Sequence, residues 1–418
     1  MPVFLPSPCP SVSRPPASGL LRTVPPFSRP LLLSVAMEML VKRGVEEDES
    51  VHSFVSRRLG KEMMMMMMKM MMMFYLSVIP RCTNVLLIFV DRHENCNHGS
   101  MRVTRSVPCL PVCVQLADIA VDSLCRGVFA GDCRKLSVRP TPAVPPGPLA
   151  QRSVTESWAQ WSLSRGVESL PECIAEFLQR SGRAELRREA AVQHISPSAS
   201  GWTISLEDGV LSADHIISAL PAKALASILP PSCHPLIQLL QDISTVTVAV
   251  VNLEYEGSIL PVSGFGHLLP SSEDQALLGV VYDSVPFPQH DRIQISESTL
   301  LTLGHGRVLQ VMMGGAWFHE VFGPPDTVTE ECLLARATEA VHCHLGVSSA
   351  PSWSRVTLQR DCIPQYYPGH FRKVESMRRF IRENNLSLSL IGASYDGVSV
   401  NDVIFNGRTA VEQLLGTG

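Results

Sequence analysis

The sequence predicts an α/β fold that carries an inserted α+β portion. Apolar residues at helical spacing alternate with short β-branched runs from Ser153 to the end of the chain. These helices and strands are mixed without a strict βαβ repeat, which indicates an added α+β part. With 418 residues, of which 45% are hydrophobic, the chain can bury the cores of more than one domain.

Charge and cysteine content argue against several classes of protein. The formal net charge is -4 and only 18% of residues are charged, which argues against nucleic acid as a partner. The 12 cysteines include no CxxC pair. The nearest approaches to metal-ligand spacing are Cys109 with Cys113, and the cluster of His342, Cys343 and His344. Neither has a second half-site, so we expect ordinary core thiols and no metal.

The N-terminal part of the chain divides into unlike segments. Residues 1–18 are rich in proline and serine and are predicted to be disordered. Residues 46–60 run from acidic residues through an apolar stripe to basic residues and a glycine, which predicts a short helix over 51–60. Residues 63–114 begin with a methionine run, and we interpret them as an atypical insertion; a Met-rich binding surface is the alternative. No stretch reaches the ~20 apolar residues of a membrane-spanning helix.

The next predicted secondary-structure element begins at residue 116. Residues 116–124 predict a helix that ends at Gly127 and Gly131, and a proline-rich linker follows over 140–148. Residues 158–179 contain helical periods. Strands are predicted over 202–206, 214–221, 245–253, 308–313 and 386–391, with a hairpin turn at 207–209 and an amphipathic helix over 329–345.

The closing segment, residues 388–411, has the pattern of a ligand site. A buried strand runs into Gly392, a loop holds Gly397, and a helix follows, with Asn401 or Asp402 as its cap. Such a turn directs backbone N–H groups at the start of the helix toward an anion. The alternative is a strand, turn and helix that only close the fold.

The same segment resembles a known family. Residues 392–402 read GASYDGVSVND and are followed by NGRTA, and this resembles the C-terminal flavin motif of protoporphyrinogen oxidases, in the amine-oxidase-like FAD superfamily. Further similar segments stand in the family's order at 25–30, 51–60, 122–132, 264–274 and 362–366. The resemblance covers residues 19–62 and 116–418.

The resemblance implies a two-domain FAD-binding flavoprotein fold. It combines a discontinuous Rossmann-like FAD domain, a mixed-sheet substrate domain and a partial helical membrane-binding domain. The implied boundaries are 19–62 and 115–139 for the membrane-binding portion, 153–221 and 376–418 for the FAD domain, and 222–375 for the substrate domain.

The implied activity is an oxygen-dependent oxidation in haem synthesis. FAD would take six electrons from protoporphyrinogen IX to give protoporphyrin IX, and O2 would be reduced to H2O2. The implied setting is the intermembrane-space side of the mitochondrial inner membrane, where a homodimer associates peripherally. One alternative is a catalytically silent product that binds porphyrin or the full-length enzyme. Another is a different amine-oxidase-like flavoenzyme, whose aromatic cage would find only Tyr395 near the flavin motif.

Two sets of site residues follow from the resemblance, and no catalytic residue is assigned. FAD contacts are expected at Val192, Leu358, Val398, Ser399 and Val400, with Ser399 standing where family members commonly have alanine. The apolar lining of the macrocycle pocket is expected at Phe265, Gly266, Leu268 and Met312. A flat tetrapyrrole needs broad apolar walls, although such side chains could also be simple core.

One part of the family pattern has no counterpart in residues 1–115. Dinucleotide flavoproteins open with a strand, a GxGxxG loop and a helix that receive the pyrophosphate of the cofactor. No such fingerprint is found there. We therefore expect a chain that is N-terminally incomplete relative to the family and binds FAD weakly or not at all, because each lost charge-assisted hydrogen bond is worth roughly 1.5–3 kcal/mol.

Overall fold

The structure of the chain is a computed structural model. It describes residues 4–8, 48–58, 116–139, 151–152, 155–156, 158–164, 166–198, 201–257, 259–260, 264–288 and 307–416. The atypical segment 63–114 and the linker 140–148 lie outside the described residues, so both remain sequence predictions. None of the helices in the described part is both long enough and apolar enough to cross a membrane.

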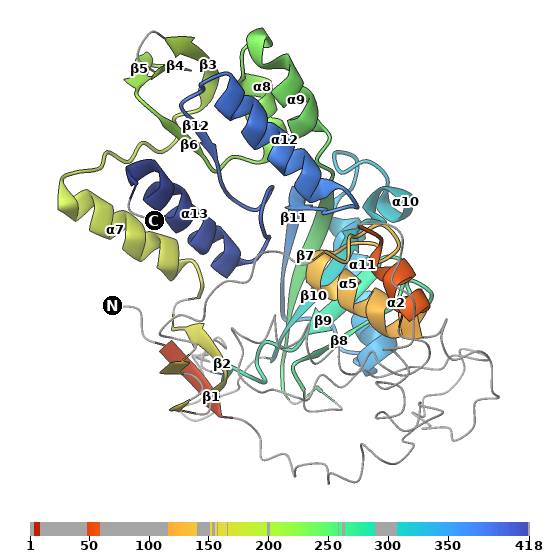
Figure 1. The fold of residues 1–418 in the computed structure, drawn as a ribbon. Coiled ribbons are helices and arrows are strands. Elements are labelled where there is room, and N and C mark those ends of the chain that lie inside the picture. The colour runs from red at the N-terminus through yellow and green to blue at the C-terminus, as the bar shows by residue number, and fades with distance from the viewer. Residues whose placement is uncertain are drawn as a thin grey trace.

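The largest element is an antiparallel five-stranded sheet in the order β11–β7–β10–β9–β8 (Figure 1). The strands are β7 (Thr245–Tyr255), β8 (Gly266–Leu268), β9 (Leu277–Val281), β10 (Arg307–Gly315) and β11 (Trp353–Pro364). The positions of β7 and β10 confirm the strands predicted over 245–253 and 308–313. Their β-branched side chains favour the extended backbone, and both strands are paired on two sides.

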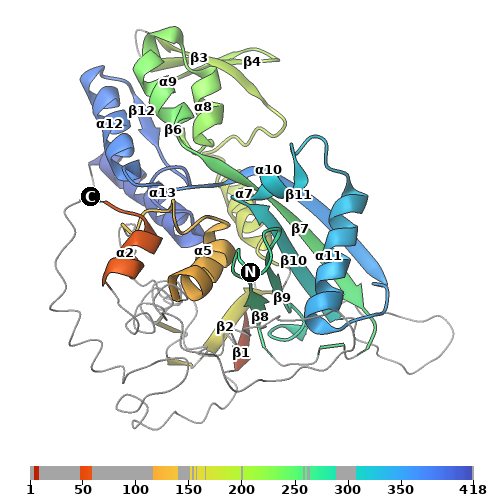
Figure 2. The same cartoon turned by 90° about the vertical axis from the view of Figure 1, so that its right-hand side faces the viewer.

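Helix α11 (Glu330–Leu345) covers one face of this sheet, as Figure 2 shows. It confirms the helix predicted over 329–345, with Thr329 as the N-cap accepting the N–H of Cys332 at 3.3 Å. The core between helix and sheet includes Val251, Leu253, Leu309, Val311, Met313, Leu333, Ala337 and Val341. Each large apolar side chain buried here stabilises the fold by roughly 1.5–3 kcal/mol. The short helix α10 (Phe318–Phe322) follows β10 and adds Phe318 to the same core.

A second core surrounds a parallel pair of strands, β6 (Ile216–Ser218) and β12 (Leu388–Leu390). Around it lie β3 (Val192–Ser198), β4 (Gly201–Leu206), β5 (Val210–Ala213), α8 (Ala222–Ile228), η4 (Pro231–Cys233), α9 (His234–Gln241) and α12 (His370–Glu383). The predicted strands at 202–206, 214–221 and 386–391 and the hairpin at 207–209 are confirmed. This core contains Trp202, Leu225, Leu236, Leu240, Met377 and Tyr395. Residues 222–241, expected in the substrate domain, thus pack in the core of β6 and β12.

The N-terminal helices form a third, smaller core. They are α2 (Val51–Arg58), a π-helical turn η3 (Leu116–Val121) and α5 (Asp122–Phe129). The helix predicted over 51–60 is confirmed. The helix expected to end at Gly127 and Gly131 runs through Gly127 and ends at Phe129, just before Gly131. Gly127 is helical because Leu268 packs against it, where an added Cβ would lie 2.4 Å from the Leu268 Cδ2 atom.

Two further expectations differ from the structure. The helical periods predicted within 158–179 are confirmed by helix α7, which spans Ser169–Ser181, but Trp158–Leu163 is strand β2. Strand β2 pairs with β1 (Phe4–Pro8), so residues 4–8 are not disordered as expected. The two prolines of β1 lack N–H donors, which an edge strand tolerates. The last helix, α13 (Val400–Leu415), follows β12 and has no buried residue.

Candidate functional site

The carboxyl ends of β6 and β12 lie side by side. The two strands are parallel, with Ser218 opposite Leu390, and the N–H of Ile391 donates to the Ser218 carbonyl at 3.0 Å. Gly392 follows with φ +99°, a backbone conformation that glycine adopts without strain. A Cβ at Gly392 would lie 3.4 Å from the Ala219 carbonyl. Ligands of α/β sheets bind at such carboxyl ends.

The chain then turns into the N-terminus of α13. Ser399 is the N-cap, and its Oγ accepts the N–H of Asp402 at 3.1 Å. The Asp402 carboxylate in turn accepts the N–H of Ser399 at 3.2 Å, which completes a capping box. Sequence reasoning proposed Asn401 or Asp402 as the cap; the cap is Ser399, because its backbone is extended (ψ 154°) while Asn401 is already helical.

The residues around these strand ends and on α13 offer polar groups to an anionic cofactor. Among the described residues, the buried Ser218 Oγ on β6 and the buried Asn406 Nδ2 on α13 have no hydrogen-bond partner. Buried polar atoms are normally paired, so both are available to a polar ligand. Gly407 would place a Cβ only 3.8 Å from Ile391 Cδ1, so this part of α13 runs past the end of β12. The positive end of the helix dipole adds a favourable field for phosphate.

The structure places the expected FAD contacts in three separate regions. Val398, Ser399 and Val400 lie together at the start of α13, where Val400 is 56% exposed. Val192 is the first residue of β3 and is 36% exposed. Leu358 lies on β11 opposite Ala249 and packs against the α11 core. Their contacts with FAD stay predictions.

The four expected substrate residues gather at one end of the five-stranded sheet. Leu268 and Met312 are both paired with Gly279, one from β8 and one from β10. Paired residues point to the same face, so these two side chains lie on one face of the sheet, on either side of the buried Gly279. A Cβ at Gly279 would lie 2.7 Å from Leu268 Cδ2, so the glycine makes room for that side chain. Gly266 precedes Leu268 on the same strand, and Phe265 beside it is 42% exposed.

This face of the sheet is the one that α11 does not cover. Val311 and Met313, on the α11 face, are fully buried, whereas Met312 and Leu268 are only partly buried. Met312 also packs against a small core on this face, formed by Ala130, Val246, Val248 and Leu278, so its partial burial fits a pocket wall and a core residue equally well. The pocket itself remains a prediction. Helix α5 borders it through the contact between Gly127 and Leu268.

Behind β8, on the α11 face, His267 joins a buried polar cluster. Its Nδ1 lies 2.7 Å from the Tyr282 hydroxyl, its ring centroid lies 5.5 Å from that of His344, and the side chain is 7% exposed. Burial, and secondly the His344 ring, lower the pKa of His267 to about 4. The imidazole is therefore neutral, and its Nδ1 shares a hydrogen bond with the Tyr282 hydroxyl, whose pKa is raised to about 12 by burial.

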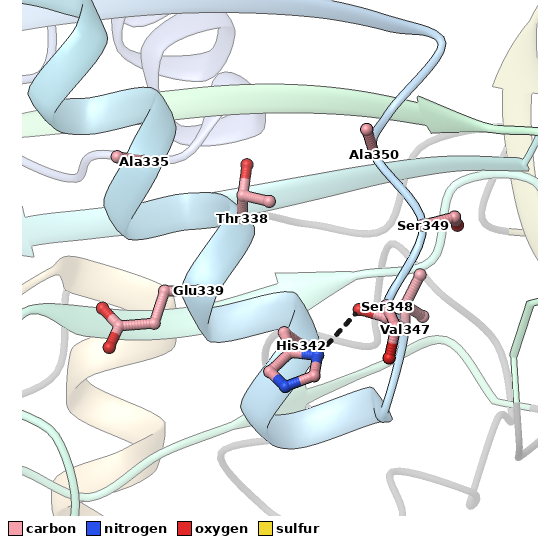
Figure 3. A pocket seen from close by; sticks show the side chains of 8 residues that line it. All are labelled: Ala335, Thr338, Glu339, His342, Val347, Ser348, Ser349 and Ala350. Atoms are coloured by element: carbon pink, nitrogen blue, oxygen red, sulfur yellow. Dashed lines mark hydrogen bonds between the residues drawn. The ribbon is translucent and has the colours of Figure 1, made fainter.

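The two histidines of the predicted cluster, His342 and His344, point in different directions. Figure 3 shows His342 on α11 facing residues 347–350. These residues line a surface depression of about 500 Å³, and the His342 Nδ1 lies 3.2 Å from the Val347 carbonyl. His344, two residues later, instead lies against His267, with the two rings tilted by 40°. The two rings thus serve different partners.

Sequence reasoning missed three residues of the open sheet face. Val281, Gln310 and Asn252 stand in one cross-strand row that continues to Gly266. The Gln310 amide donates to the Asn252 side chain at 3.5 Å. The alternation of side chains along β7 and β10 could have placed Asn252 and Gln310 on the face of Met312, but strand register is set by pairing that the sequence does not show.

Comparison with known proteins gives the family. A family model described as flavin containing amine oxidoreductase matches residues 26–415. Protoporphyrinogen oxidases of Macaca fascicularis and Homo sapiens are each 38% identical over 425 residues, covering 96% of this chain and 76% of theirs. Among solved structures, an Exiguobacterium sp. 255-15 protein is similar with TM-score 0.61 and 17% identity, covering 91% of this chain and 71% of that one. At that identity the structural likeness shows the fold, which is the two-domain flavoprotein fold expected from the sequence. The chain therefore belongs to the flavin-containing amine oxidoreductases, a family of FAD-dependent oxidoreductases.

Proposed function

We propose that this chain is a protoporphyrinogen oxidase of haem synthesis. Its substrate is protoporphyrinogen IX, its product is protoporphyrin IX, and three molecules of O2 accept the six electrons and six protons as three of H2O2. Bound FAD supplies the redox chemistry. The observation that carries the proposal is the apolar strip of Leu268, Gly279 and Met312, whose two large side chains are partly buried, in a chain 38% identical to the primate oxidases.

The chain's own residues have two tasks in this proposal. Leu268 and Met312 provide apolar walls for a flat macrocycle, and the buried Gly279 between them leaves room for the Leu268 side chain. The turn after β12 and the start of α13 receive the anionic cofactor. The apolar surroundings also keep water from the reacting carbon atoms. No acid or base is assigned, because no titratable side chain stands in the strip.

The test is turnover of protoporphyrinogen by the purified full-length chain supplied with FAD. We expect porphyrin fluorescence to rise while O2 is consumed in a three-to-one ratio to product. The variant Met312→Gln should raise KM about tenfold, because it places an amide against the macrocycle. The matched control Ala335→Gln, on the exposed surface of α11, should leave KM unchanged. Bound FAD without porphyrin formation would refute the proposal.

The same sample tests the expectation of weak flavin retention. Flavin absorption bands at near-stoichiometric occupancy would refute that expectation without affecting the assignment of the substrate. Porphyrin quenching without turnover would instead indicate the silent alternative.

For cellular setting, we propose a peripheral homodimer on the intermembrane-space side of the mitochondrial inner membrane. The support is the family resemblance, which includes the helices α2 and α5 of the membrane-binding portion. Fractionation of mitochondria tests it: the chain should pellet with inner membranes and be released by alkaline carbonate. Recovery in the matrix fraction would refute it.

A further inference from the structure

One tyrosine hydroxyl closes the turn that follows β12. The Tyr366 hydroxyl donates to the Ala393 carbonyl at 2.6 Å and accepts the N–H of Gly397 at 2.8 Å. A phenol has one O–H to donate and lone pairs to accept, so this single group spans the turn from its first residue to its last. Burial raises the pKa of Tyr366, which keeps the hydroxyl protonated and able to donate.

The ring of Tyr366 is held in turn by His370, at the start of α12. The two rings are stacked, with centroids 3.8 Å apart and planes 10° from parallel. His370 is 3% exposed, and its Nε2 lies 2.9 Å from the Tyr395 carbonyl. A carbonyl only accepts, so Nε2 carries the proton and donates. Burial lowers the pKa of His370, which favours this neutral ring.

The remaining residues of the turn are also held from outside. Two N–H groups of Arg378 contact the carboxylate of Asp396. The N–H of Ala222 donates to Ser394 Oγ at 3.1 Å. Each of the five consecutive residues Ala393, Ser394, Tyr395, Asp396 and Gly397 is thus bonded to another element of the fold. A turn fixed at every residue is preorganised before any ligand arrives.

Tyr366 itself stands where three parts of the molecule meet. Its carbonyl accepts the N–H of Ser137, which follows α5. The preceding Gln365 donates its side-chain amide to the Phe129 carbonyl at 3.0 Å and its N–H to the Ser244 carbonyl at 2.9 Å. Through these hydrogen bonds, the position of the turn is fixed relative to the five-stranded sheet and to α5. Both of these elements border the predicted macrocycle pocket.

We propose that Tyr366, oriented by His370, is a positioning residue for FAD. It sets the 393–397 turn, and through it the N-terminus of α13, at the place where the cofactor anion is received. The side chain acts through the turn and does not touch the cofactor. This inference rests on the use of FAD in the proposed function and adds the residue pair that builds the cofactor cradle.

The test compares Tyr366→Phe with Tyr367→Phe in the full-length chain. The first change removes only the hydroxyl and keeps the stacked ring, and the second removes the hydroxyl of the neighbouring half-buried tyrosine. FAD is titrated into each apoprotein, and flavin fluorescence gives Kd. We expect Kd to rise roughly tenfold or more for Tyr366→Phe, because the Gly397 N–H loses its partner, and to stay within twofold for Tyr367→Phe.

Two further readouts separate positioning from simple stability. Hydrogen exchange of the 393–397 amides should accelerate in Tyr366→Phe without FAD, and the midpoint potential of the bound flavin should shift. Loss of unfolding free energy with unchanged Kd and potential would overturn the inference. Wild-type protein that binds no FAD would overturn it too. FAD binding that depends on Tyr366 in a chain that does not oxidise protoporphyrinogen would instead refute only the proposed function.

Discussion

Lowering the pH should destabilise this protein through His267. The ring is buried and its pKa is lowered to about 4, against 6.5 for an ordinary histidine. In the unfolded chain, His267 takes up a proton as pH falls through 6.5. In the folded chain, the same ring is protonated only near pH 4. In that window the unfolded state binds more protons, so the free energy of unfolding falls as pH falls.

The size of the effect follows from the shift. A pKa difference of about 2.5 corresponds to about 3 kcal/mol, which is lost progressively between pH 6.5 and 4. A domain of ordinary stability has only about 5–15 kcal/mol in total. Because His267 stands between Gly266 and Leu268, its protonation should also disturb the strand that carries the predicted pocket.

The assay is urea unfolding at pH 7.5, 6, 5 and 4 for the wild type and for His267→Gln. Glutamine can keep a hydrogen bond to Tyr282 but does not titrate, and carboxylate effects are common to both proteins. Between pH 7.5 and 4 the wild type should lose about 3 kcal/mol more than the variant. The exposed His319, changed to Gln, serves as the control and should follow the wild type. Parallel pH curves for His267→Gln and wild type would show that the reasoning is wrong.

Three other substitutions test separate parts of the structure by chemical denaturation. Ser399→Ala should lower the unfolding free energy by about 1 kcal/mol, because it removes the N-cap of α13; an unchanged midpoint would contradict the capping box. Gly127→Ala should cost about 1–3 kcal/mol, because its methyl would collide with Leu268, whereas Gly407→Ala in α13 meets only an ordinary contact and should stabilise by about 0.5–1 kcal/mol. If Gly127→Ala and Gly407→Ala changed the unfolding free energy in the same direction, the packing described around the two glycines would be contradicted. Arg126→Met should cost about 3 kcal/mol or more, because the guanidinium donates to four backbone carbonyls that would lose their partner.

Periodic segments could be predicted from sequence because local pattern and burial agree there. The run at 245–253 alternates and is β-branched, and the helix at 329–345 has both a cap and a glycine stop. Strand β11 was missed because it is an edge strand rich in charged and polar residues, and its conformation is decided by pairing with β7. Of the two glycines predicted to end α5, Gly127 lies inside the helix, because a contact with a residue 141 positions away overrides the low helix propensity of glycine.

The closing turn shows most clearly where local reasoning stops. The sequence indicated an anion site at Gly392, Gly397 and the following helix. This was possible because the backbone conformation of the turn depends on residues that are adjacent in the sequence. The turn is made rigid by Tyr366, which lies 31 residues before Gly397 in the chain, after β11. No sequence motif around Tyr366 predicts its hydrogen bond to Gly397. A glycine-rich turn without such partners would pay its ordering entropy when the cofactor binds. Because this turn is held at five consecutive residues, its conformational entropy is lost during folding and not when FAD binds. Residues that do not touch FAD can therefore determine the affinity for it.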